Sequence, residues 1–170
     1  MNVPAGFTRL AGSERAAAPG AVRTGPADPG ETLSVTILVR RRPDAPPLPD
    51  PGAADVSAAG TYEPAMSREQ FAASYGAAPE DLERVATFAR AHGLEVVETS
   101  AASRTVVAKG TVAQMSAAFG VELSRYATDG GSYRGREGAL HVPADLDGVV
   151  EGVFGLDDRP MARRAGPPLA

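Results

Sequence analysis

The sequence predicts an α+β fold, a ferredoxin-like βαββαβ antiparallel sandwich followed by a C-terminal extension and a linker. Two kinds of hydrophobic periodicity support this prediction: residues 33–39 alternate with the period of a strand, and residues 82–89 repeat with the period of a helix. The order of such segments along the chain is strand, helix, strand, strand, helix, strand, which is the split βαβ pattern. With 170 residues, 43% of them apolar, the chain is long enough for one compact domain with extended segments.

Residues 1–30 are rich in Ala, Gly and Pro and show no hydrophobic period. Such a segment buries too little apolar surface to offset the entropy lost on ordering. We therefore expect a flexible arm over 1–30, a folded domain over 31–158 and an exposed linker over 159–170.

The first predicted strand follows this arm. Its apolar residues alternate with polar ones, so one face is expected to be buried; these residues are Leu33, Val35, Ile37 and Val39. Five prolines between positions 43 and 51 end the strand and begin a long loop that reaches residue 64.

Two consecutive helices are predicted next. Ser67 and Gln70 form a capping box, and Gly76 suits the left-handed position that closes a short helix. Pro79 favours the first position of a second helix, and Gly93 provides its end. The apolar face of this helix has the spacing i, i+3, i+4, i+7 and consists of Leu82, Val85, Ala86 and Ala89.

Residues 94–98 and 104–109 are predicted to form two strands joined by a short polar turn. A second capping box, Thr111 with Gln114, begins a helix that Gly120 ends. Residues 121–126 are the sixth predicted element, a strand that completes the sandwich. Beyond the turn at 128–131, the helical spacing of Leu146, Val149, Val150 and Val153 predicts a short helix over 144–153.

Composition excludes several classes of protein. A net charge of −4 and a pI near 5.2 disfavour binding to nucleic acid or to an anionic membrane surface. The absence of Cys excludes disulfides and thiolate chemistry. No apolar run approaches the roughly 18 residues of a membrane span, and the N-terminus lacks the apolar core of a recognisable signal peptide.

The residues that catalysis or metal binding would need are scarce. His92 and His141 are the only histidines, and neither has a second ligand at metal spacing. Ser132 follows two glycines, but Arg134 stands where a nucleophile elbow has its closing Gly, so a hairpin turn is expected there. We therefore expect no catalytic, metal or cofactor-binding residue in this chain.

Several motifs in order give the chain a family resemblance. They are Ser67-Arg68-Glu69-Gln70-Phe71, Gly93-Leu94-Glu95-Val96, Tyr133-Arg134-Gly135-Arg136 and Phe154-Gly155-Leu156-Asp157-Asp158-Arg159-Pro160. Together they resemble the N-terminal activation domain of sedolisin (kumamolisin-like) serine peptidases, which has the same ferredoxin-like architecture. The Ser-Gly-Thr-Ser type motif of the sedolisin active site does not occur here. In that family calcium binds to the catalytic domain and not to this segment.

The resemblance implies a propeptide that acts as intramolecular chaperone and inhibitor of a sedolisin-type endopeptidase until its linker is cut at acidic pH. It implies a catalytic-domain partner, in cis or in trans, and an extracellular location as part of a secreted precursor. If interface carboxylates such as Glu95, Glu98, Asp157 or Asp158 pair with cations of the partner, acid would weaken the complex.

Candidate residues for these roles follow from the motifs. Tyr and Arg are frequent binding hot spots, so the interface candidates are Tyr133, Arg134 and Arg136, with Asp157, Asp158 and Arg159 at the domain exit. The last three are also expected to pair locally, and Phe154 and Leu156 are expected to pack into the core. Linker cleavage is expected near Arg163 or Arg164, where Arg164 replaces the Pro common in the family.

Two other functions remain open at this point. The chain could be a free-standing inhibitor that acts in trans, which a stop codon after Ala170 would favour. It could also be a ferredoxin-like binding module unrelated to proteolysis, because this fold hosts many functions.

Overall fold

A four-stranded antiparallel sheet forms the centre of the molecule. The computed structural model describes residues 3–47 and 67–159 of the chain. The sheet contains β3 (Thr32–Val39), β4 (Glu95–Ser100), β5 (Thr105–Thr111) and β9 (Val150–Phe154), in the order β4-β5-β3-β9. Its neighbouring strands are all antiparallel, with β3 between β5 and β9.

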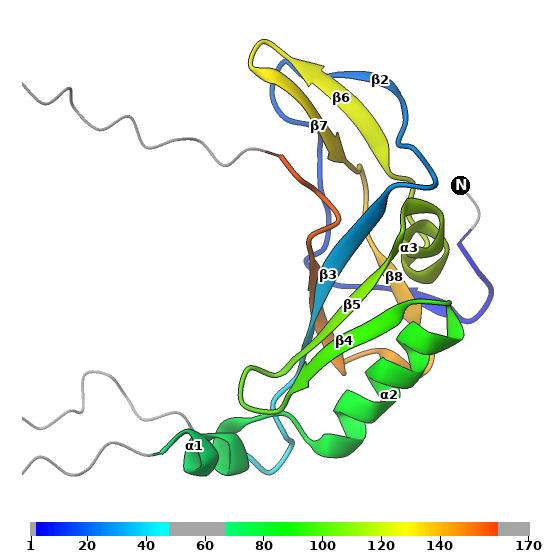
Figure 1. Ribbon diagram of the computed structural model, residues 1–170. Helices are drawn as coiled ribbons and strands as arrows, with labels where there is room; N and C mark the ends of the chain where they lie inside the picture. Colours follow the sequence, from blue (N-terminus) through cyan, green and yellow to red (C-terminus); the bar gives the residue numbers. More distant parts are fainter. Residues whose placement is uncertain (1–2, 48–66, 160–170) are drawn as a thin grey trace, which may run out of the picture.

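One face of this sheet is covered by helices. The alternating residues Leu33, Val35, Ile37 and Val39 of β3 are buried, as their spacing predicts. Helices α2 (Pro79–Ala91) and α3 (Val112–Phe119) lie on this side (Figure 1). Their buried side chains include Val85, Ala89, Met115 and Phe119, so the main core lies between this helical layer and the sheet.

The sandwich has the predicted ferredoxin-like arrangement, but its last strand is not the expected one. Along the chain the elements are β3, α2, β4, β5, α3 and β9, and in the sheet the first strand lies between the third and the fourth. The segment 121–126, predicted to be the last strand, instead leads into β6 (Ser124–Thr128), which belongs to another sheet. The ferredoxin-like fold class is therefore confirmed, and the elements between α3 and β9 are an insertion.

The predicted helix over 144–153 is wrong. The chain forms a short 3-10 turn, η1 (Ala144–Leu146), and then strand β9, in which Val150 pairs with Val39 of β3. Gly148 has a positive φ of 68° and separates the two elements, and Gly152 is a poor helix former. Pairing with the free edge of β3 outweighs a helical spacing that only four apolar residues supported.

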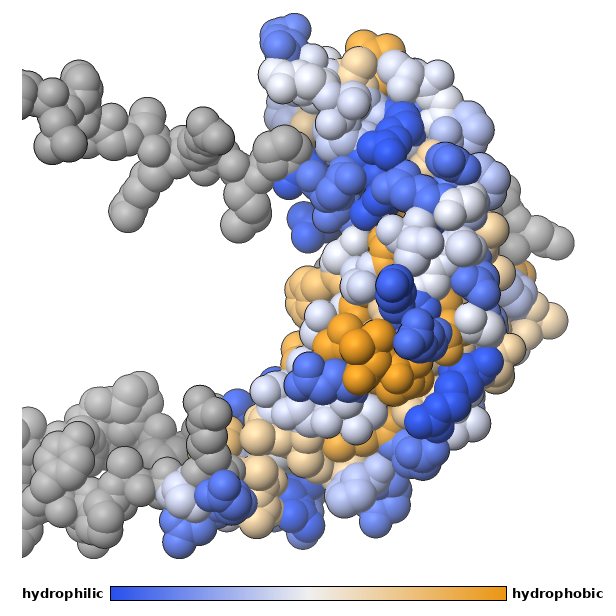
Figure 2. Space-filling model, viewed as in Figure 1, coloured by the Kyte–Doolittle hydropathy of each residue, from blue (hydrophilic) through white to orange (hydrophobic). Residues whose placement is uncertain are grey.

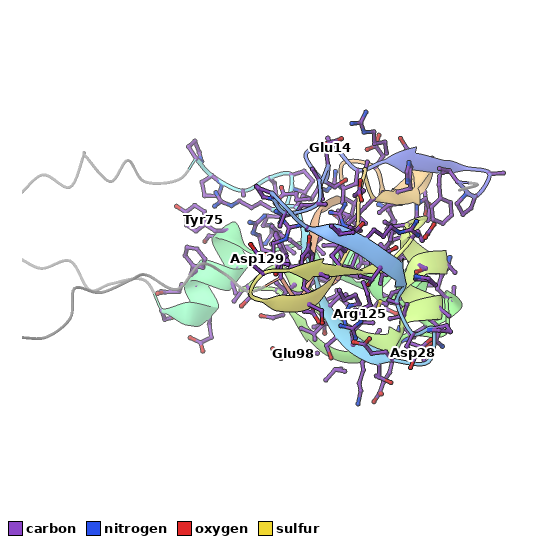
Figure 3. All side chains as sticks on the ribbon, turned by 90° about the horizontal axis from the view of Figure 1, so that it is seen from above. Glu14, Asp28, Tyr75, Glu98, Arg125 and Asp129 are labelled. Atoms are coloured by element: carbon purple, nitrogen blue, oxygen red, sulfur yellow. The ribbon has the colours of Figure 1, made fainter. Side chains whose placement is uncertain are left out.

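A second, three-stranded sheet projects beside the sandwich, with β2 (Val22–Pro26), β6 and β7 (Gly131–Gly135) in the order β2-β6-β7. Strands β6 and β7 form a hairpin, and Asp129 lies at its loop end in the view from above (Figure 3). Strand β1 (Phe7–Arg9) pairs with β8 (His141–Pro143). The prediction of a flexible arm is therefore wrong for residues 3–30, whose strands pair with segments more than 90 residues away.

The helix ends agree with the sequence in most details. Ser67 caps α1 (Arg68–Tyr75) and Thr111 caps α3, each through a complete capping box. Gly120 ends α3 as predicted, in a left-handed conformation, whereas the left-handed conformation predicted for Gly76 is wrong, because Gly76 is extended after α1. In the extended conformation the Gly76 amide still donates to the carbonyl of Ala72. Within the described residues, no helix is long and apolar enough to cross a membrane.

Candidate functional site

The described helices leave the other face of the central sheet uncovered (Figure 1). We call this the open sheet face. Thr36 of β3 lies on it, and the register places Val107 of β5 and Phe154 of β9 on either side of Thr36. Leu38 lies two residues further along β3 on the same face. Val97 of β4 follows the core-facing Val96 at a bulge, where the register with β5 shifts between Val96 and Glu98.

The open sheet face carries exposed apolar side chains. Val97 is 58% exposed and Phe154 is 55% exposed, and both are large hydrophobic residues. Figure 2 shows apolar surface over β4 and β5, next to strongly hydrophilic surface. Exposed apolar surface on one face of a domain often marks an interaction site.

Charged residues lie at one border of this apolar surface. Glu95 and Glu98 of β4 are exposed, and the register pairs Glu95 with Lys109 and Glu98 with Val107. An apolar centre with a charged border is the usual composition of a protein interface.

The predicted interface anchors on and after β7 are not surface residues. Tyr133 is 2% exposed, and Arg134 and Arg136 are each 5% exposed. Their contacts are made inside the domain, which leaves little of these side chains for a partner. Their residue types suggested a binding surface. In the structure, two distant segments of the chain cover these residues, so their contacts are internal.

Arg134 holds the segment that follows β9. Its Nε donates to the carbonyl oxygen of Leu156 at 3.1 Å, and its guanidinium pairs with Glu31 and with Asp158. Arg125 of β6, labelled in Figure 3, pairs with the same two carboxylates. The cluster therefore balances two cations with two anions, as a largely buried guanidinium requires.

Arg136 and Tyr133 hold the N-terminal segment instead. Arg136 donates at 2.7 Å to the carbonyl oxygens of Ser13 and Gly138. Burial, and secondarily the nearby Arg15, lowers the pKa of the Arg136 guanidinium below its usual range. The Tyr133 hydroxyl accepts a hydrogen bond from the Ala18 amide at 2.9 Å, and its ring stacks on Tyr126.

The residues of the domain exit pair locally, as expected. Asp157 accepts from the Arg159 backbone amide at 2.8 Å and lies 3.3 Å from the Arg159 guanidinium. Asp158 contacts Arg134 through both backbone and side chain. Leu156 is buried as predicted, but Phe154 is not, because the alternation of β9 turns it toward the open sheet face. The linker and the cleavage candidates Arg163 and Arg164 lie outside the described residues, apart from Arg159.

Neither histidine lies in a cluster of metal ligands. The Nδ1 of His92 is 3.0 Å from the carbonyl oxygen of Phe88, and that of His141 is 3.3 Å from the carbonyl oxygen of Gly120. Over residues 3–47 and 67–159, no group of three or more His, Asp or Glu side chains is arranged to hold a metal ion.

Sequence reasoning missed two features of this site. Val97 was not singled out, and Phe154 was expected in the core, although both side chains are exposed. The contacts of residues 13–18 were also missed, and these carry no local signal because their partners are more than 100 residues away.

Comparison with known proteins agrees with the motifs. Residues 19–159 match the family model described as "Pro-kumamolisin, activation domain". The chain is 40% identical over 158 residues to kumamolisin of Bacillus sp. (strain MN-32), and the alignment covers 91% of this chain and 28% of that protein. It is 30% identical over 173 residues to tripeptidyl-peptidase sed5 of Aspergillus fumigatus, covering 92% of this chain and 30% of the relative.

The chain thus spans less than a third of the length of either relative. The family match, in contrast, includes every strand of the central sheet and both helices that cover it. The chain belongs to the pro-kumamolisin activation domain family, the propeptides of sedolisin-type peptidases.

Proposed function

We propose that this domain inhibits a sedolisin-type catalytic domain and assists its folding, and that it docks through the open sheet face. The observation that carries the proposal is the uncovered sheet face with its exposed Val97 and Phe154. In an activation domain, the covalently attached peptidase is the partner that such a surface most simply serves.

The size of the face indicates how much of an interface it supplies. Four strands spaced about 4.8 Å apart and about six residues long cover roughly 20 by 20 Å. A standard interface buries about 800 Å² on each partner. The open sheet face therefore supplies about half of that area, and neighbouring elements are needed for the rest.

The domain exit is well placed to contribute to this interface. Strand β9 ends at Phe154, and the chain reaches Arg159 only five residues later. A catalytic domain docked on Phe154 would thus lie next to the start of the linker. This proximity supports inhibition, since the linker would enter the interface region directly. Cleavage of the linker near Arg163 or Arg164 would then release the activation domain.

The chaperone role rests on rigidity. Strands from distant parts of the chain are held in one sheet by continuous backbone pairing and a packed core. A rigid face of this kind can stabilise a folding intermediate by binding it without losing its own conformational entropy.

We also propose that the precursor is secreted and that the activation domain itself needs no cofactor.

Acidic release follows from the charged border. A carboxylate paired with a cation in a complex binds its proton less readily than in the free state, so the pair stabilises the complex at neutral pH. Acid protonates the carboxylate and removes that contribution. Glu95 and Glu98 are candidates for such pairs because they are exposed beside the apolar surface.

The test is inhibition of a mature sedolisin-type peptidase by purified residues 1–170. The expected result is stoichiometric inhibition at neutral pH that weakens near pH 4. A folded domain that fails to inhibit at either pH, and fails to raise the refolding yield of the denatured peptidase, would contradict the proposal.

A further inference from the structure

Two terminal segments of the domain meet on strand β7. We call residues 13–18 the N-terminal strap and residues 155–159 the exit segment. They are separated by more than 130 positions in the chain, and each is held by a side chain that is buried on or just after β7. Neither segment takes part in the central sheet.

The strap is fixed at three points. The Arg15 amide donates to the carbonyl oxygen of Gly138 at 3.0 Å, and the Gly138 amide donates back at 2.9 Å. Arg136 donates to the carbonyl oxygen of Ser13, and the Ala18 amide donates to the Tyr133 hydroxyl. Buried partners of this kind are costly to leave unpaired, so the strap is expected to detach as one unit.

The exit segment is fixed in a similar way. The Asp158 amide donates to the backbone carbonyl of Arg134 at 3.0 Å, and the Arg134 guanidinium donates to the carbonyl oxygen of Leu156. Leu156 is buried in the core, and Gly155 passes so close to β3 that a Cβ there would lie 2.5 Å from the carbonyl oxygen of Ser34.

Arg159 joins the two segments directly. Its Nη2 donates to the carbonyl oxygen of Ala16 at 3.0 Å, and its guanidinium carbon lies 4.9 Å from the centre of the Tyr133 ring. Tyr133 therefore contacts the strap through its hydroxyl and the exit segment through its ring. A cation over an aromatic ring is attractive, and more so when partly removed from water.

We propose that Tyr133 and Arg159 couple the strap to the exit segment, so that detachment of one loosens the other. The strap is then a latch on the domain exit. One consequence rests on the proposed function: the latch holds the start of the linker in place until the strap is displaced. The coupling itself is a property of the chain alone and does not depend on any peptidase.

Hydrogen exchange of residues 1–170, measured for single amides, tests the coupling in both directions. Arg159→Ala removes the contacts with Ala16 and Tyr133. The expected result is about tenfold faster exchange at the amides of Arg15 and Ala18. Tyr133→Phe removes the acceptor of the Ala18 amide but keeps the ring, and the expected result is faster exchange at the Asp158 amide.

Matched controls separate coupling from general loosening. Arg42→Ala removes an arginine that pairs with Asp44 and Ala73, away from both segments, and Tyr126→Phe removes a hydroxyl that donates to Glu137. Both controls should leave strap and exit segment unchanged. Amides of β3 and β5 report global unfolding, so a variant that only destabilises the fold is recognised by their faster exchange.

The two outcomes are distinct. Faster exchange of the strap in Arg159→Ala and of the exit segment in Tyr133→Phe, with β3 and β5 unchanged, supports the latch. Unchanged exchange of the strap in Arg159→Ala, or of the exit segment in Tyr133→Phe, overturns it. Because no peptidase is present, failure of the inhibition assay would leave this result unaffected.

Discussion

At the residue scale, side chains near β7 combine a polar group with almost complete burial. Arg134 and Arg136 are buried because backbone carbonyls and carboxylates of distant segments accept their hydrogen bonds. The sequence identified these residues as important but assigned them to a partner interface. Residue type indicates the capacity for several hydrogen bonds, and only the tertiary structure decides whether their acceptors lie inside or outside the domain.

Gly155 illustrates a position where the backbone admits no side chain. Its φ is 101°, and a Cβ would lie 2.5 Å from the carbonyl oxygen of Ser34. We expect Gly155→Ala to lower the free energy of unfolding by about 2 kcal/mol or more, since both the dihedral strain and the clash oppose it. Denaturant titration measures this change. Gly130→Ala is the control, because nothing lies within 4 Å of its Cβ position; equal effects at the two sites would contradict the account.

Tyr126 gives the domain an alkaline pH dependence. Burial, and secondarily the hydrogen bond to Glu137, raises the pKa of Tyr126 from 10.0 to about 12. The folded pKa is raised, so the stabilising contribution is complete below pH 10 and is lost as the pH rises toward 12, by about 2 kcal/mol. Unfolding of the wild type and of Tyr126→Phe across this range should show a smaller loss in the variant. Parallel curves would show that Tyr126 is not responsible.

At the element scale, local signals predicted well and distant pairing did not. Capping boxes at Ser67 and Thr111 and the alternation of β3 depend on neighbours in the sequence, and all three are confirmed. Strands β1 and β2 are short and depend on β8 and β6 for their backbone partners. Their Ala-, Gly- and Pro-rich sequence carries no periodicity, so composition alone suggested disorder. The same limitation made β6 appear to be the last strand of the sandwich.

Leu10 tests whether the N-terminal elements belong to the fold. It follows β1, is buried, and donates its amide to the carbonyl oxygen of Leu140. Leu10→Ala should lower the free energy of unfolding by about 2–3 kcal/mol, the cost of a cavity in a packed core. The measurement is thermal or denaturant unfolding, with the exposed Val22→Ala as control. A flexible arm would make both substitutions neutral.

At the scale of the whole molecule, the sequence predicted the fold class and the family. It predicted which face of the sheet is free for docking, but not all the side chains on that face. The order of the elements predicts a sheet with one face free of helices, and the structure has that arrangement. Which side chains occupy this face depends on the identity of the last strand. Once β9 replaces the segment 121–126, Phe154 moves from the expected core to the open sheet face.

On the proposed function, the open sheet face binds the peptidase. The most direct measurement is the inhibition constant of residues 1–170 against a mature sedolisin-type peptidase, for the wild type and for a Val97→Asp, Phe154→Asp double variant. Both side chains are exposed, so the variant should fold normally, while charges buried in an apolar interface should weaken inhibition by at least about 100-fold. Val22→Asp, at an exposed site on β2, is the control and should inhibit like the wild type. Wild-type inhibition by a folded double variant would contradict the claim.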